Sequence, residues 1–147
     1  MRLSAFIPVV LLATQPALAD PAPISVMSAW VRAGPPSLSV YAGYMVLQNN
    51  SDKELTVVGV SSQRFAKVEM HKTEIENGIA RMVKKSGLVI GPHSVLKFEP
   101  GGLHFMLLEP NAPLKLDERI PVRLEFANGQ SMNTELVVRA TSPDNKE

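Results

Sequence analysis

The sequence predicts an all-β domain, built as an antiparallel β-sandwich or barrel. Three observations support this. From residue 23 onward no stretch shows a helical period, short apolar stretches recur instead, and Gly, Pro, Asn and Asp separate most of them. Short strands at regular spacing with turn residues between them are typical of this class.

The expected strands follow one another along the whole chain after residue 23. In order they are Ile24–Arg32, Ser39–Gln48, Leu55–Ser62, Ala66–Ile75, Ile79–Lys84, Ser94–Phe98, Leu103–Leu108, Ile120–Phe126 and Ser131–Arg139. The turns between them contain Gly34-Pro35-Pro36, Asn49–Asp52, Asn77-Gly78, Gly91-Pro92, Pro100–Gly102, Pro110-Asn111 and Asn128-Gly129. The 120–126 stretch alternates apolar and charged residues, as a strand with one buried face should.

Length and charge indicate the domain organisation. A chain of 147 residues fits one domain, and 15 basic against 14 acidic residues leave no basic patch of the kind that binds nucleic acid. Residues 1–19 match an export signal, with Arg2, an apolar run over Leu3–Ala13 and small residues in Ala17-Leu18-Ala19. We expect a single domain over 20–147, ordered over about 24–140, with no membrane span in the mature protein.

Cysteine is absent from the 147 residues. This excludes disulfides, thiol redox chemistry, thiolate metal sites and a lipid anchor on cysteine. Any metal site must therefore use His, Met or carboxylate ligands.

The turn at Asn77-Gly78 predicts a two-residue type I′ hairpin, because both positions accept positive φ. The register then pairs Thr73 with Met82 and His71 with Lys84. Side chains alternate between faces, so His71, Thr73 and Met82 share one face. His71 and Met82 become diagonal neighbours.

A second pair of candidate ligands lies at His104 and Met106. Two residues apart on a strand, they project from the same face, while Phe105 and Leu107 point to the core. Together the pairs make a site of two imidazoles and two thioethers. Thioether sulfur suits Cu(I), whereas zinc favours Cys, His and carboxylate, and calcium requires oxygen.

Each candidate also has a purely structural interpretation. Methionine in a strand usually fills the core, and we expect this of Met27, Met45, Met70 and Met132. His93 follows Gly91-Pro92 and is expected to be a turn residue.

The sequence resembles the PCuAC family of periplasmic copper chaperones. The family motif is a histidine, ten residues, a methionine, twenty-one residues and then His-x-Met, and His71, Met82, His104 and Met106 match it with both spacers intact. Around the motif, Ala29–Arg32 and Pro100–Leu107 also fit.

The resemblance implies a cupredoxin-like fold, an exposed Cu(I) site and delivery of copper towards a cytochrome c oxidase subunit, often alongside a Sco-type protein. Some members bind Cu(II) through a His- and Met-rich tail, but Thr141–Glu147 has neither residue. A periplasmic copper buffer without a dedicated acceptor is the alternative. An enzyme would need a substrate pocket, and a blue-copper carrier needs a cysteine ligand. If the domain had only a structural role, the spacing of its candidate His and Met ligands would be a coincidence.

Overall fold

The computed structural model describes residues 22–143, which form ten strands in one sheet. The strands are β1 (Ile24–Arg32), β2 (Val40–Asn49), β3 (Leu55–Ser61), β4 (Phe65–Glu76), β5 (Ile79–Lys85), β6 (Leu88–Ile90), β7 (Val95–Phe98), β8 (Leu103–Pro110), β9 (Arg119–Phe126) and β10 (Ser131–Arg139). Within these residues there is no helix with the length and hydropathy to cross a membrane.

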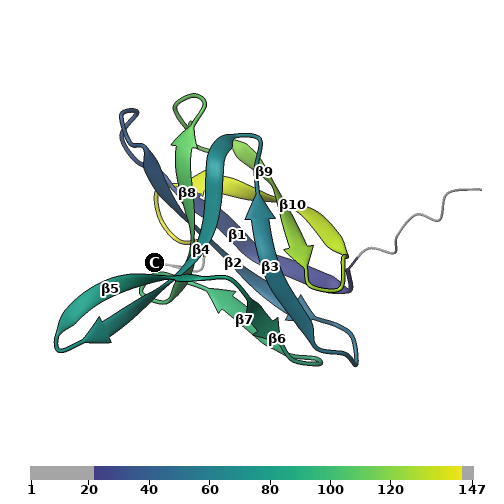
Figure 1. The fold of residues 1–147 in the computed structure, drawn as a ribbon. Coiled ribbons are helices and arrows are strands. Elements are labelled where there is room, and N and C mark those ends of the chain that lie inside the picture. Colours follow the sequence, from purple (N-terminus) through teal and green to yellow (C-terminus); the bar gives the residue numbers. More distant parts are fainter. Residues whose placement is uncertain (1–21, 144–147) are drawn as a thin grey trace, which may run out of the picture.

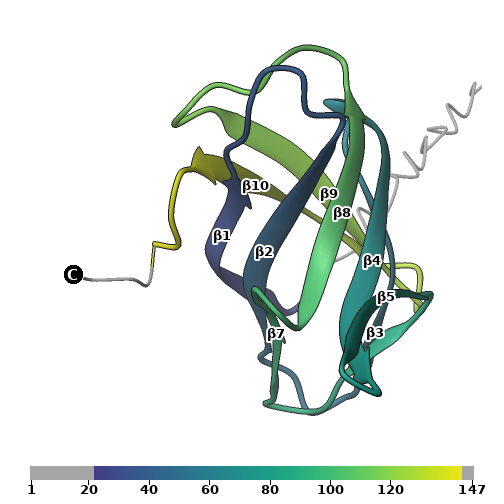
Figure 2. The ribbon, with the colours of Figure 1, turned by 90° about the vertical axis from the view of Figure 1, so that its left-hand side faces the viewer.

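The sheet folds over on itself into two layers (Figures 1 and 2). Its order is β5-β4-β8-β7-β2-β1-β10-β9-β3-β6, with an added pairing of β8 to β2. Strands β1, β2, β8 and β4 lie in one layer, and β10, β9 and β3 lie in the other. The hydrophobic core fills the space between the layers, and the β4–β5 hairpin extends beyond it.

All nine strands expected from the sequence are present, with their ends shifted by at most two residues. The tenth, β6, was missed because its three residues are too few to show a period. The expected antiparallel pairing does not hold for two pairs, since β1 lies parallel to β10 and β7 parallel to β8. Strands β1 and β10 are remote in sequence, so no tight turn forces them to run in opposite directions.

The β4–β5 hairpin has the predicted turn and register. Asn77 and Gly78 have φ values of 52° and 77°, as a type I′ turn requires. Thr73 lies opposite Met82, and His71 lies opposite Lys84. This places Met82 on the face of the sheet that carries His71.

Strand β8 is anchored to the core by its alternate residues. Phe105 and Leu107 are fully buried, and the Phe105 ring stacks on Phe98 with centroids 4.1 Å apart. Because neighbouring side chains point to opposite faces, this packing turns His104 and Met106 to the outer face of the layer.

Packing roles expected for methionines are confirmed at Met45 and Met70, which are 1% and 3% exposed. Met132 is partly buried against the core. The expectation was wrong for Met27, which lies on the surface. A bulge between Met27 and Trp30, with Ser28 at φ 48°, changes the alternation of β1 there.

Arg64, the residue directly before β4, holds the loop that leads to β9. Its Nε donates to Glu118 Oε1 at 2.8 Å, and its other nitrogens donate to the Asn111 side chain and to the carbonyls of Ala112 and Pro113. The guanidinium lowers the pKa of the Glu118 carboxyl below its usual 4.5.

We expect Glu118→Gln to reduce the free energy of unfolding by about 1 kcal/mol at pH 7. A carboxyl whose pKa is lowered in the folded state stabilises the fold above its ordinary pKa, and this contribution is lost as the pH falls. The difference between wild type and variant should therefore shrink below about pH 4.5. Urea unfolding from pH 7 to pH 3 measures it. Glu135→Gln, which removes the exposed pair with Arg119, is the control, and a constant difference for Glu118→Gln would contradict the assignment.

Candidate metal site

His71 and His104 lie directly opposite each other on β4 and β8. Their ring centroids are 6.0 Å apart, with the ring planes inclined by 32°. Both side chains are buried, yet neither belongs to the hydrophobic core cluster. Two imidazoles are therefore held next to each other, with their rings tilted, on the outer side of the layer.

The proton on His104 is assigned by the turn that precedes β8. His104 Nδ1 lies 3.1 Å from the carbonyl oxygen of Gly102, and a carbonyl only accepts. The same oxygen accepts the Thr73 N–H from β4 at 3.1 Å. Gly101 makes this turn with φ 82°, a conformation that side chains disfavour. Nδ1 therefore donates, and Nε2 carries the lone pair.

The proton on His71 is assigned by Glu69, two residues earlier on the same face of β4. His71 Nε2 lies 2.8 Å from Glu69 Oε2. Hydrogen bonds from Lys67, Lys84 and His71 hold the pKa of the Glu69 carboxyl well below its usual range, so the group is ionised and only accepts. Nε2 of His71 therefore donates, and Nδ1 carries the lone pair.

The two nitrogens left over have no hydrogen-bond partner. His71 Nδ1 and His104 Nε2 are both buried, and within residues 22–143 they are the only buried side-chain nitrogen or oxygen atoms without a partner. Leaving a buried polar atom unpaired costs about 1–3 kcal/mol. Two bare lone pairs on facing rings are the arrangement that a metal ion requires of imidazole.

The two candidate methionines lie at different depths on this face. Met106 is half-buried on β8, opposite Glu69 and two residues from His104. Met82 lies on β5 opposite Thr73 and is 62% exposed. The structure thus brings the two histidines together and places Met106 in the next cross-strand row. Met82 lies on the β4–β5 hairpin, nearer to solvent than the two histidines.

Carboxylates do not complete this site. The described residues contain no group of three or more His, Cys, Asp or Glu side chains that could hold a metal ion. Glu69 approaches the histidines only through the protonated nitrogen of His71. The soft donors on this face are the thioethers of Met82 and Met106.

Sequence reasoning missed Glu69. Its signal was the spacing of two residues before His71, which places both side chains on one face of a strand. His93 is a turn residue as expected, with φ 51° and its Nε2 2.6 Å from Asp52 Oδ1.

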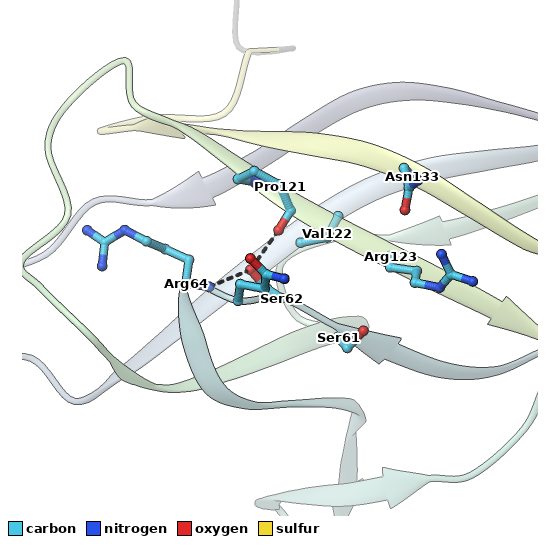
Figure 3. Close-up of a pocket in the computed structure, with 8 residues that line it drawn as sticks. Ser61, Ser62, Arg64, Pro121, Val122, Arg123 and Asn133 are labelled. Carbon is cyan, nitrogen blue, oxygen red and sulfur yellow. Dashed lines mark hydrogen bonds between the residues drawn. The ribbon is translucent and has the colours of Figure 1, made fainter.

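A separate hollow of about 350 Å³ lies between the β3–β4 turn and strand β9 (Figure 3). Ser62 Oγ donates to the Pro121 carbonyl at 2.6 Å and accepts the Arg64 N–H at 3.2 Å. The guanidinium of Arg64 extends away from Ser62, towards Glu118. The two groups drawn together here, the Ser62 hydroxyl and the Arg64 guanidinium, already have partners within the protein, and we assign no site to this hollow.

Comparison with known structures defines the fold class. The structure matches the copper-bound PCuAC domain from PmoF2 with a TM-score of 0.68 and 20% identity, over 83% of this chain and 97% of that domain. It matches the solution structure of CuI-DR1885 from Deinococcus radiodurans with a TM-score of 0.66 and 30% identity, over 87% of this chain and 86% of that one. The fold is the cupredoxin-like fold of PCuAC domains, and the resemblance seen in the sequence is confirmed.

Family membership follows from the sequence match. Residues 24–138 match the family described as "Putative lipoprotein LpqE-like". Over 124 residues the chain is 32% identical to the "Putative lipoprotein Lxx21020" of Leifsonia xyli subsp. xyli, covering 84% of this chain and 74% of the relative. This chain belongs to the LpqE-like family.

Proposed function

We propose that this protein is a periplasmic copper chaperone that binds one Cu(I) through His71, Met82, His104 and Met106. The observation that carries the proposal is the pair of bare, buried imidazole nitrogens on facing rings. The hydrogen bonds to Glu69 and Gly102 leave these two atoms as the donors available to an ion.

The donor set favours Cu(I) over other ions. Thioether sulfur is soft and suits Cu(I), while zinc sites rarely use methionine. All four donors are neutral, so a singly charged ion costs less to hold in a partly buried site than a doubly charged one. The relative from Deinococcus radiodurans, 30% identical to this chain, has a solution structure in its Cu(I) form.

The depth of the ligands supports a route for the ion. His71 and His104 are buried, Met106 is half-buried, and Met82 is exposed. An acceptor ligand could therefore reach copper from the Met82 side and join it before the histidines release it. Met82 would be the donor most easily replaced.

Transfer is favoured towards thiolate sites. Thiolate is a better partner for Cu(I) than thioether or imidazole, and this chain has no cysteine that could compete. We propose that copper passes towards cytochrome c oxidase assembly, to a two-cysteine site of an oxidase subunit or a Sco-type protein. The protein acts by binding and release, not as an enzyme. It reaches the periplasm through the signal peptide predicted at residues 1–19, which lie outside the described residues.

Copper transfer to a reduced acceptor tests this function. Loaded protein is mixed with an apo two-cysteine acceptor, the two are separated, and copper is assayed in each. We expect one Cu(I) per chain before mixing and nearly all copper on the acceptor afterwards. Copper that stays on this protein, with a competent acceptor present, would favour the alternative of a copper buffer. If the protein bound no Cu(I) at all under reducing conditions, the alternative of a purely structural domain would be favoured.

A further inference from the structure

Glu69 lies beside His71, and its carboxylate accepts a hydrogen bond from the imidazole. Its side chain is only 12% exposed, and its carboxylate contacts Nε2 of His71, not the unpaired Nδ1. We propose that Glu69 is a positioning residue that fixes the tautomer and ring orientation of His71 for copper. The effect on copper binding rests on the proposed function, whereas the tautomer of His71 in the metal-free protein does not.

The carboxylate has an assigned partner on each oxygen. Oε2 accepts His71 Nε2–H at 2.8 Å, while Oε1 accepts Lys84 Nζ at 2.8 Å and also pairs with Lys67. Lys84 comes from β5, directly opposite His71, and Lys67 comes from β4 itself. Glu69 is thereby held from two strands, and it cannot rotate freely away from the imidazole.

The consequence for His71 follows from the chemistry of imidazole. A neutral ring carries its proton on one nitrogen and its lone pair on the other, and the hydrogen bond to one decides which is free. With Nε2–H held by Glu69, the lone pair resides on Nδ1, the atom left bare and buried. Without Glu69 the ring could place its proton on either nitrogen and rotate about its side-chain bonds, so fewer molecules would present Nδ1.

The two histidines are fixed by different acceptors. His104 depends on the carbonyl of Gly102, which belongs to the backbone and cannot be removed by substitution. His71 depends on a side chain. A substitution at Glu69 therefore changes one ligand and leaves the other in place, which makes the role testable.

The test uses three variants of the full chain. Glu69→Ala removes the acceptor, and Glu69→Gln keeps an oxygen acceptor while removing the charge. Glu74→Gln is the matched control, because Glu74 lies on β4, faces the opposite side and pairs with Lys85 of β5 at 2.9 Å. Circular dichroism verifies that each variant is folded.

The first readout is the tautomer of His71 in the metal-free protein. It is measured by ¹⁵N–¹H NMR of the imidazole at about pH 8, above the ordinary pKa of a histidine side chain, which is about 6.5. We expect the Nε2–H form in wild type, Glu69→Gln and Glu74→Gln, and a mixture of both forms in Glu69→Ala. The signals of His104 should remain those of the Nδ1–H form in all four proteins.

The second readout is Cu(I) affinity, measured by competition with a chromophoric chelator. We expect Glu69→Ala to lower the affinity by about 10- to 100-fold, as is typical when a ligating histidine loses its outer partner. Glu69→Gln should stay close to wild type. If Glu69→Gln bound Cu(I) as weakly as Glu69→Ala, the charge rather than the hydrogen bond would be responsible, and the positioning role would be overturned. An unchanged tautomer in Glu69→Ala would also overturn it. If the tautomer shifts as expected but wild type binds no Cu(I), the positioning of His71 stands and the proposed function falls.

Discussion

The double variant His71→Ala/His104→Ala is expected to lose Cu(I) binding. The two side chains supply the only buried donor atoms without partners in the described part of the chain, and the thioethers that remain lie nearer to solvent. The loss should exceed the roughly 10- to 100-fold that removal of an outer hydrogen-bond partner costs. Competition with a Cu(I) chelator under reducing conditions measures it.

The fold should survive this double substitution. Neither ring belongs to the hydrophobic core, so their removal leaves the packing between the layers intact. His93→Ala is the control, because His93 is an exposed turn residue paired with Asp52. If His93→Ala weakened binding as much as the double variant, the facing histidines would not be the site.

Exchanging Met82 and Val83 is expected to lower Cu(I) affinity as much as Met82→Ala does, by about tenfold or more, equivalent to about 1.4 kcal/mol. Met82 lies opposite Thr73 on the face of His71, while Val83 lies opposite Lys72 on the other face. The exchange keeps length and composition and moves only the thioether to the wrong side of the strand. The same chelator competition measures the change.

A remote methionine provides the control for this experiment. Met27 is exposed on β1, and Met27→Leu should leave the affinity unchanged. Full affinity in the Met82/Val83 exchange would mean that the position of the thioether on β5 does not matter. Met82 would then be removed from the ligand set, and the site would consist of His71, His104 and Met106.

Local rules were sufficient for the strands and for the hairpin. The Asn77-Gly78 turn permits one register, so the pairing of Thr73 with Met82 followed from counting residues. Alternation predicted that Phe105 and Leu107 enter the core and that His104 and Met106 do not. These features depend on residues a few positions apart, and the sequence alone therefore determined them. The strand β6 was not predicted because three residues are too few to show a period, and the bulge near Met27 was not predicted because it breaks the alternation of β1.

Only the tertiary structure decided that His71 faces His104. Strands β4 and β8 are not joined by a tight turn, and no local rule sets their register. The adjacent pair, Met70 opposite Phe105, is buried in the core, and a slip of one residue would turn one of these side chains out to solvent. Gly102 and Glu69 each lie two residues before the histidine that they contact, so these hydrogen bonds are local. That the two histidines lie together is fixed by packing of the whole core, which no short stretch of sequence contains.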